Sequence, residues 1–364
     1  MIKLQARIFN LLSAYLHGKE VEEDLFTKLN EDEWELLVST LSLHAMTSVG
    51  YYGLAPLIEK GMAPEKVKMK IIHEVLSAER SNTMRQALVG KLHEFFKEAN
   101  VKCLLLKGPS LAAYYKKSCD RKYVDLDIYS PNQGKKVDEL FRSKGVKVHD
   151  DFYRHSGMIL NGVSVENHHY LLDVQGRSYQ VERDNDLKAL AIKYLEGIEE
   201  PGLYYPDAKF STMFNMHHAL SHLIYEGISL RFILDWGLFL KSETIVVKSP
   251  EVESLLRKHN LMKLAAAMSK VLVDKMDYPM AELPDYLIKE ISLIDDRLMS
   301  RFYEDLFRKY EVIYTKNLLR NRFMTVRRIL RASWKVRAFL GESPFAFVVG
   351  KIIPILRGKK FEAD

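Results

Sequence analysis

The chain has 364 residues, of which 47% are hydrophobic and 28% charged, as is ordinary for a globular protein with two or three structural units. Its two cysteines are too few for a disulfide framework, and its last apolar run, PFAFVVGKIIPIL, is too short to span a membrane, so we expect a cytoplasmic protein without a secretory signal. The net charge of +6 excludes neither enzymes nor binding proteins, but it is unevenly distributed along the chain.

Residues 1–99 are predicted to form an N-terminal helical region. Apolar residues recur there at spacings of three and four, which is the period of an amphipathic helix. The segment PEKVKMKIIHEVLSAERSNTMRQALVGKLHEFFKEAN predicts one long helix with Pro64 near its start. This region contains no strand pattern and no repeat.

Residues 100–205 are predicted to form a compact α/β core. The run VKCLLL indicates a buried strand, GPSLAAYYKK a helix, VDLDIYS a second strand and GKKVDELFRSKG a second helix. Two further β-type runs flank Asn161-Gly162, the dipeptide most typical of a tight hairpin, because both of its residues accept positive φ. We therefore expect an α+β fold in which a small mixed sheet is flanked by helical regions.

Residues 206–364 are predicted to form a C-terminal helical domain that ends in a basic tail. Two consecutive helices are expected on either side of Gly227. From Arg301 onward there are fifteen Lys or Arg and six Asp or Glu, interleaved with aromatic and aliphatic residues. We favour a solvated helical face packed on the body of the protein; peripheral contact with an acidic membrane is the second interpretation and nucleic acid the third.

Asp125 and Asp127 are the first candidates for chemistry, because residues i and i+2 of a strand project from one face. Val124, Leu126 and Ile128 are expected to fill the other face. Two adjacent carboxylates repel each other unless a cation neutralises them or one takes up a proton, and such pairs suit Mg²⁺. The alternative is a solvated acidic face on an edge strand.

A candidate anion site precedes this strand. The run Lys107-Gly108-Pro109-Ser110 joins the first strand to a helix start, where backbone amides free of intrahelical bonds can bind phosphate. Gly108 would allow close approach of the backbone, Ser110 would donate its hydroxyl, and Lys107 and Arg121 would supply positive charge.

The segment LLLKGPSLAAYYKKSCDRKYVDLDIYS resembles the polymerase-β-like nucleotidyltransferase superfamily, and within it a bacterial family of uncharacterised nucleotidyltransferases often encoded with surface-polysaccharide genes. The positions that match the family in this segment are Lys107-Gly108, Leu111-Ala112, Tyr115, Arg121, Asp125 and Asp127. The similarity continues in VSVENHHYLL at Glu166 and His168, and in MHHALSHLIYEGISLRFILDWGLFL at His218, His222, Arg231 and Asp235. Pro109 departs from the superfamily pattern, in which glycine is followed directly by serine or glycine.

The resemblance implies that Asp125, Asp127 and a third carboxylate hold Mg²⁺ or Mn²⁺ and catalyse nucleotidyl transfer from an NTP. Glu166 is preferred as the third carboxylate, because Ser164, Glu166 and His168 would share one face, and Asp173 is the rival. The nucleotide-binding residues implied are Lys107, Gly108, Ser110, Arg121, His168 and His222.

Two pairs at helical spacing, His218/His222 and Arg231/Asp235, are open to a plainer interpretation. The histidines lack the glutamate of a zinc-protease motif, so we expect packing residues or cleft-lining residues rather than zinc ligands. Arg231 and Asp235 are expected to form an intrahelical ion pair.

The function predicted is transfer of a nucleoside monophosphate from an NTP to an unidentified hydroxyl acceptor, with a link to surface polysaccharide synthesis suggested by the resemblance. The alternatives are a catalytically inactive binding or scaffold protein of the same fold, and a membrane-surface adaptor that uses the basic tail. Binding of nucleic acid is not expected.

Overall fold

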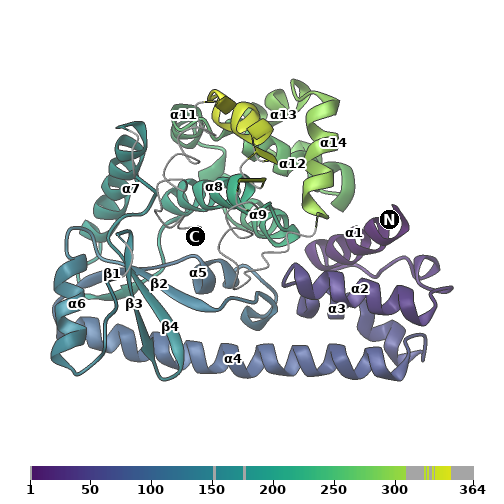
Figure 1. The fold of residues 1–364 in the computed structure, drawn as a ribbon, viewed down its shortest axis with the longest axis horizontal. Helices are drawn as coiled ribbons and strands as arrows, with labels where there is room; N and C mark the ends of the chain where they lie inside the picture. The colour runs from purple at the N-terminus through teal and green to yellow at the C-terminus, as the bar shows by residue number, and fades with distance from the viewer. Residues whose placement is uncertain are drawn as a thin grey trace.

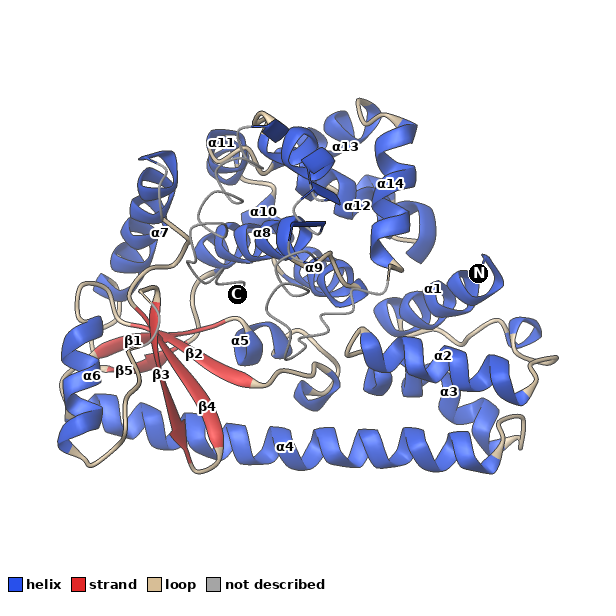
Figure 2. Cartoon of the chain, in the orientation of Figure 1, coloured by secondary structure: helices blue, strands red, loops and turns tan. Residues whose placement is uncertain are grey.

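The structure is a computed structural model that describes residues 2–150, 153–174, 178–308, 324, 326–327, 330–331 and 333–345. Helices surround one small mixed sheet, which confirms the α+β expectation (Figure 1, Figure 2). Over the described residues, no helix combines the length and the hydrophobicity needed to cross a bilayer. Most of the predicted basic tail, including residues 309–323 and 346–364, lies outside the described residues.

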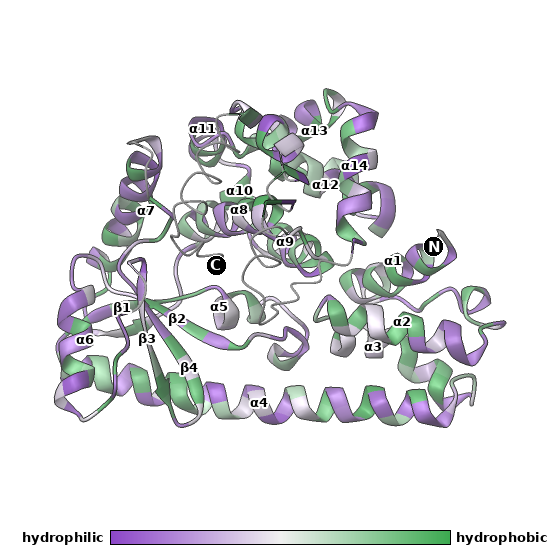
Figure 3. Cartoon of the chain, viewed as in Figure 1, coloured by the Kyte–Doolittle hydropathy of each residue, from purple (hydrophilic) through white to green (hydrophobic). Residues whose placement is uncertain are grey.

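Four helices precede the sheet: α1 (Ile2–His17), α2 (Glu31–Leu43), α3 (Thr47–Glu59) and α4 (Glu65–Glu98). Helix α2 begins with a capping box in which the Asn30 side chain and the Glu33 side chain each bond the other's backbone amide. The long helix α4 starts directly after Pro64, as predicted, and its 34 residues run beneath both the sheet and α1–α3 (Figure 1). Its turns alternate between hydrophilic and hydrophobic, as expected of a helix covered on one side (Figure 3).

The sheet has five strands in the order β3-β4-β2-β1-β5. They are β1 (Lys102–Leu106), β2 (Asp125–Tyr129), β3 (His155–Leu160), β4 (Val163–His168) and β5 (Gly202–Tyr204). Strand β2 is antiparallel to β1 and parallel to β4, so it is the central strand, and the edge-strand alternative is wrong. The predicted hairpin is confirmed, because Asn161 and Gly162 turn between β3 and β4 with φ of 50° and 78°.

The two faces of the sheet pack against different parts of the protein. One face, with Leu105, Leu126 and Ile128, packs against α4 and α6 (Gly134–Ser143). The other face, with Leu104 and Tyr129, joins the large core formed by the helices. Val124 does not pack with Leu126 and Ile128 as expected, since it precedes the strand and is 68% exposed.

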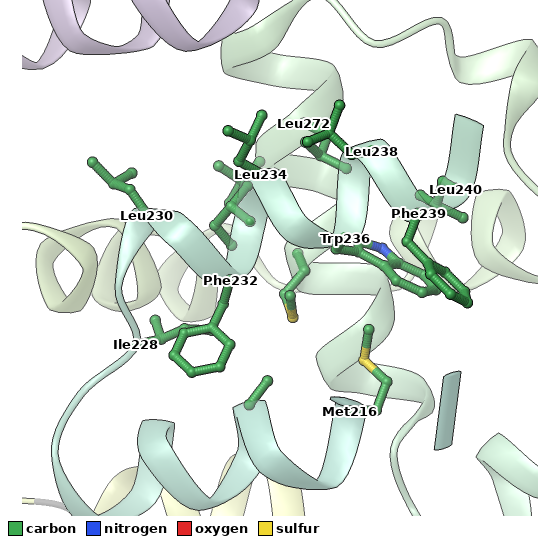
Figure 4. Packing of buried hydrophobic residues seen from close by; sticks show 14 of the residues in the cluster. Met216, Ile228, Leu230, Phe232, Leu234, Trp236, Leu238, Phe239, Leu240 and Leu272 are labelled. Carbon is green, nitrogen blue, oxygen red and sulfur yellow. The ribbon is translucent and has the colours of Figure 1, made fainter. Parts of the chain in front are cut away.

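The helices after the sheet are α7 (Ser178–Glu196), α8 (Ala208–Tyr225), α9 (Leu230–Ser242), α10 (Thr244–Val247), α11 (Pro250–Lys258), α12 (Met262–Met276), α13 (Asp285–Ser292) and α14 (Asp296–Leu306). Helices α8 and α9 lie on either side of Gly227, as predicted. Helix α9 is buried on nearly all sides, and Figure 4 shows its apolar side chains beside Met216 of α8 and Leu272 of α12. Gly237 makes this packing close, because an added Cβ would lie 2.8 Å from the Leu272 side chain.

One hydrophobic core joins the first helix to the helices that follow the sheet. Leu11, Leu12 and Leu16 of α1 belong to the same buried cluster as α8, α9 and α12. In the described part of the basic tail, Lys335 is buried and pairs with Asp305 at 2.7 Å, while it donates to the Leu223 carbonyl at 2.8 Å. This lysine therefore stabilises the helical packing and is not part of a solvated face.

Candidate metal and nucleotide site

The candidate carboxylates lie on two neighbouring parallel strands. The register of β2 and β4 pairs Asp127 with Glu166 and Tyr129 with His168. Residues paired in this way have side chains on the same face, so Glu166 lies beside Asp127 on the face that is turned towards α8. Lys107, the residue that follows β1, reaches the same place from the other side of β2.

Asp127 is buried and accepts two strong hydrogen bonds. Its Oδ1 accepts from the Lys107 Nζ at 3.1 Å and from the His168 Nε2 at 2.8 Å. Burial alone would raise the pKa of this carboxyl, but the Lys107 charge and the His168 bond outweigh it and hold the pKa well below its usual range. Asp127 is therefore ionised at neutral pH and oriented by its two partners.

His168, which was predicted to bind the nucleotide, is buried against Asp127. Its side chain has no exposed surface, and burial lowers the pKa of the imidazole, so the ring is neutral. Both ring nitrogens contact oxygens: Nε2 lies 2.8 Å from Asp127 Oδ1, and Nδ1 lies 3.3 Å from the Tyr170 carbonyl. The shorter contact favours a proton on Nε2, directed at Asp127. His168 is a positioning residue for Asp127.

Glu166 and Asp125 are held in a strained electrostatic environment. Burial, reinforced by the charges of Asp127 and Asp125, raises the pKa of Glu166 to about 7. The pKa of Asp125 is raised by burial and then by Asp127. His155 Nε2 lies 3.7 Å from Glu166 but supplies no charge at neutral pH, because burial lowers the pKa of His155 to about 4. Three crowded carboxyls without enough cations form a site that a divalent ion would relieve.

The donor set fits a divalent metal ion. Donor atoms of Asp127, Glu166 and His168 all lie within 4.8 Å of one another, and Asp125 projects from the same face one register step away. The group offers carboxylate oxygens, which are the donors preferred by Mg²⁺ and Mn²⁺, and one imidazole nitrogen, which lies 2.8 Å from Asp127 Oδ1. The rival carboxylate, Asp173, bonds the Tyr153 hydroxyl and lies outside this group.

The Lys107–Ser110 loop is built differently from the predicted phosphate cradle. Lys107 has a positive φ of 43°, which is unusual for a residue with a side chain. A Cβ on Gly108 would lie 2.9 Å from the Tyr123 ring, so glycine is needed here for packing against Tyr123. The Ser110 hydroxyl donates to the Lys107 carbonyl at 2.7 Å and is buried. Helix α5 (Gly108–Ala112) is a single short turn, and of these residues only Lys107 directs a charge into the site.

Arg121 also differs from its predicted role in nucleotide binding. It is 5% exposed and forms a bidentate pair with Asp235 at 2.8 and 2.9 Å, while Tyr115 donates to the same carboxylate at 2.7 Å. The expected Arg231–Asp235 ion pair is replaced by this one, and Arg231 instead donates to the Lys122 carbonyl at 2.9 Å. These contacts join α9 to the segment that precedes β2.

The histidines of α8 do not form a metal site in the described part of the chain. His222 pairs with Glu226 at 2.9 Å, and its ring contacts that of His218 edge-on with centroids 4.5 Å apart. Burial, with help from the nearby Lys107 charge, holds the pKa of His218 well below its usual value. His218 lines a small cavity of about 30 Å³ between the sheet face and α8, in agreement with the cleft-lining interpretation, and His222 is not among the residues that line it.

Arg154 is a candidate functional residue that sequence reasoning missed. Together with Lys107 it lines the cavity below α8, and its charge acts on Glu166 and His168. It precedes β3, and its backbone carbonyl accepts from the amides of His169 and Tyr170 just beyond β4. No motif marks this arginine, because the pairing of β3 with β4 alone brings it to the site.

The mixed sheet thus presents carboxylates from two parallel strands, with a lysine and an arginine beside them, in a group that could hold a divalent metal ion. The chain belongs to a family described as uncharacterised nucleotidyltransferases, which matches residues 30–273. No curated protein and no solved structure shows significant similarity to the chain.

Replacement of Glu166 by Gln is expected to stabilise the metal-free protein. The folded-state pKa of Glu166 lies above the 4.5 that is usual for an exposed glutamate, so stability is highest when the group is protonated and is lost as the pH rises through about 7. Gln removes this loss, and we expect a gain of about 1–2 kcal/mol in unfolding free energy near pH 8, after allowance for partial exposure.

Urea unfolding of both proteins across this pH range would measure the effect. The difference is expected to vanish towards about pH 4.5, where the wild-type carboxyl is already neutral. A Gln variant less stable than wild type at high pH would show that Glu166 is not under electrostatic strain.

Proposed function

We propose that this protein transfers a nucleoside monophosphate from a magnesium-bound NTP to a hydroxyl group of an acceptor molecule. The observation that carries the proposal is the pairing of Asp127 with Glu166 on neighbouring parallel strands, beside Lys107. Membership of the nucleotidyltransferase family supports the same reaction type.

Asp125, Asp127 and Glu166 would hold Mg²⁺ or Mn²⁺. When bound, such an ion neutralises the phosphates and stabilises the oxygens that enter and leave the α-phosphorus. Lys107 and Arg154 would orient the phosphate chain and offset the negative charge that develops on the leaving pyrophosphate. His168 would keep the Asp127 carboxylate oriented through its 2.8 Å bond.

Glu166 would also serve as the general base. The acceptor oxygen forms a bond to the α-phosphorus, the bond from that phosphorus to the bridging oxygen breaks, and pyrophosphate leaves. The acceptor proton passes to a Glu166 oxygen. In the metal-free site the pKa of Glu166 is raised to about 7, and a bound metal ion would lower it and so keep the carboxylate ionised and ready to accept the proton at neutral pH.

A label-transfer experiment tests the proposal. Cell extract that supplies acceptors is incubated with the protein, Mg²⁺ and NTP labelled on either the α- or the γ-phosphate. We expect only the α-label to appear on a product, with the γ-label released as pyrophosphate. Transfer of the γ-label would indicate a kinase and contradict the proposal. Metal-dependent binding of NTP without release of pyrophosphate would favour the inactive scaffold.

Two finer points of the proposal concern its setting. Cys103 and Cys119 are both free thiols, which supports a reducing compartment such as the cytoplasm. We also propose an acceptor from surface polysaccharide synthesis, on the resemblance alone. Labelled product from an extract that lacks polysaccharide precursors would contradict this second point.

A further inference from the structure

A second cavity lies on the other side of the segment that precedes β2. It has a volume of about 160 Å³ and is enclosed by α3, α4 and residues 119–124, including η2 (Ser118–Asp120) at one edge. This is the volume of roughly five water molecules in the liquid, so the cavity suits a small ligand or one end of a larger one.

Hydroxyl groups line much of this cavity. Ser48, Ser77 and Ser81 contribute hydroxyls that have no protein partner among the described residues. Two neighbouring polar side chains are fixed: Thr47 donates to Glu74 at 2.7 Å, and Asn82 donates to Ser118 at 3.0 Å. The hydroxyls can therefore both donate to and accept from a ligand rich in hydroxyl groups, beside Thr47 and Asn82 side chains that are already held.

The free charges of the cavity are mainly positive. Arg85 is held by a bond from its Nε to the Val124 carbonyl at 3.3 Å and by the Tyr123 ring, 5.3 Å from its guanidinium. It forms no ion pair with any carboxylate of the described chain, and the same holds for the exposed Lys122. Arg121 is neutralised by Asp235, and Glu74 is the one acidic side chain in the described lining. The arrangement of a fixed guanidinium and a nearby ammonium suits a phosphate or a carboxylate.

The cavity lies next to the candidate metal site along the chain, on the α4 side of the segment before β2. Tyr123 and Val124 line it, and Asp125 follows directly, so the Cα of Asp125 lies within about 8 Å of these lining residues. Tyr123 also contacts Gly108, next to Lys107. A ligand would have to extend past Val124, which is exposed, to bring a hydroxyl group from the α4 side of this segment to the carboxylates on the α8 side.

We infer that this hydroxyl-lined cavity binds the acceptor, and that the acceptor is a small anionic polyol. The serine hydroxyls would bond its hydroxyl groups, and Arg85 with Lys122 would bind its phosphate or carboxylate. The statement that this ligand is the acceptor rests on the proposed function. The binding of the ligand itself can be measured without any transfer reaction.

Isothermal titration calorimetry on the full chain tests the binding. The probes are glucose 6-phosphate, glycerol 3-phosphate and gluconate, with glucose and inorganic phosphate for comparison. We expect at least one anionic polyol to bind more tightly than both comparison compounds, and the preference between phosphate and carboxylate identifies the anionic group. Arg85→Gln should weaken that binding by about tenfold or more, whereas Arg80→Gln, an exposed position on the same helix, should leave it unchanged.

Three results would overturn the inference. The first is that none of the three polyols binds at millimolar concentration, and the second is that folded Arg85→Gln binds the polyol as tightly as the wild type. The third is that Arg85→Gln loses affinity for Mg·NTP to the same extent as it loses affinity for the polyol. The last would mean that the cavity holds the nucleotide. Lys122→Gln, at an exposed position, provides a second variant if Arg85→Gln does not fold. Polyol binding that depends on Arg85, in a protein that transfers no label, would leave the cavity assignment intact while the proposed function fails.

Discussion

Asp127→Asn is expected to lower the rate of nucleotidyl transfer by about a thousandfold or more, equivalent to ~4 kcal/mol of transition-state stabilisation. The amide has nearly the shape of the carboxylate but lacks the charge that would hold the metal ion. It also leaves the buried Lys107 without its anionic partner. The rate is measured as release of pyrophosphate, and binding of Mg·NTP by calorimetry.

The control for this variant is Asp277→Asn, which removes a carboxylate from a surface pair with Lys19 far from the sheet. It should retain wild-type transfer. Because Asp127→Asn breaks a buried ion pair, its fold must be checked, and Glu166→Gln offers a second variant that is expected to lose activity while gaining stability. Full activity in both site variants would exclude the sheet carboxylates from the reaction.

Asp235→Ala is expected to cost about 3–5 kcal/mol of unfolding free energy. Arg121 would then be buried without a counterion, and the Tyr115 hydroxyl would lose its acceptor. Thermal and urea unfolding measure this loss. Arg231→Gln is the matched control, because it removes the charge once expected to pair with Asp235 while the Arg121 pair remains.

The triple variant Arg121→Met, Asp235→Leu and Tyr115→Phe separates the cost of an unpaired charge from the loss of the contact itself. Replacement of a buried ion pair by apolar groups of similar size is often close to neutral, so we expect most of the stability to return. A triple variant as unstable as Asp235→Ala would show that the ion pair itself stabilises the junction between α9 and the segment before β2. Transfer activity in a stable triple variant would show that Arg121 does not bind the nucleotide.

Much of the secondary structure could be predicted from local patterns. The long helix after Pro64, the strand before Lys107, the acidic strand and the Asn161-Gly162 hairpin are all confirmed. Each depends on periodicity or on a turn residue with a special backbone conformation. Strand β5 and helix α7 were not predicted: β5 has three residues and forms only through its pairing with β1, and α7 lacks a clear apolar period.

The roles of the charged residues were harder to predict, because charge and residue type do not reveal the partner. In the sequence Arg121 has the charge and the position of a phosphate ligand, but in the structure it forms a bidentate ion pair with Asp235, 114 positions away along the chain. Ser110 resembled a donor to phosphate, but its hydroxyl is used by the Lys107 carbonyl. The cavity enclosed by α3, α4 and residues 119–124 has no sequence signal, since its serines look like ordinary polar positions of exposed helices.

The sequence by itself determined the elements and the pair of carboxylates on one strand, because alternation in a strand is a local property of the backbone. Only the tertiary structure decided that β2 is central and parallel to β4, and hence that Glu166 rather than Asp173 lies beside Asp127. It also decided which cations face the carboxylates. These are pairings between distant segments, and the burial that raises or lowers each pKa exists only once the sheet has packed beneath the helices.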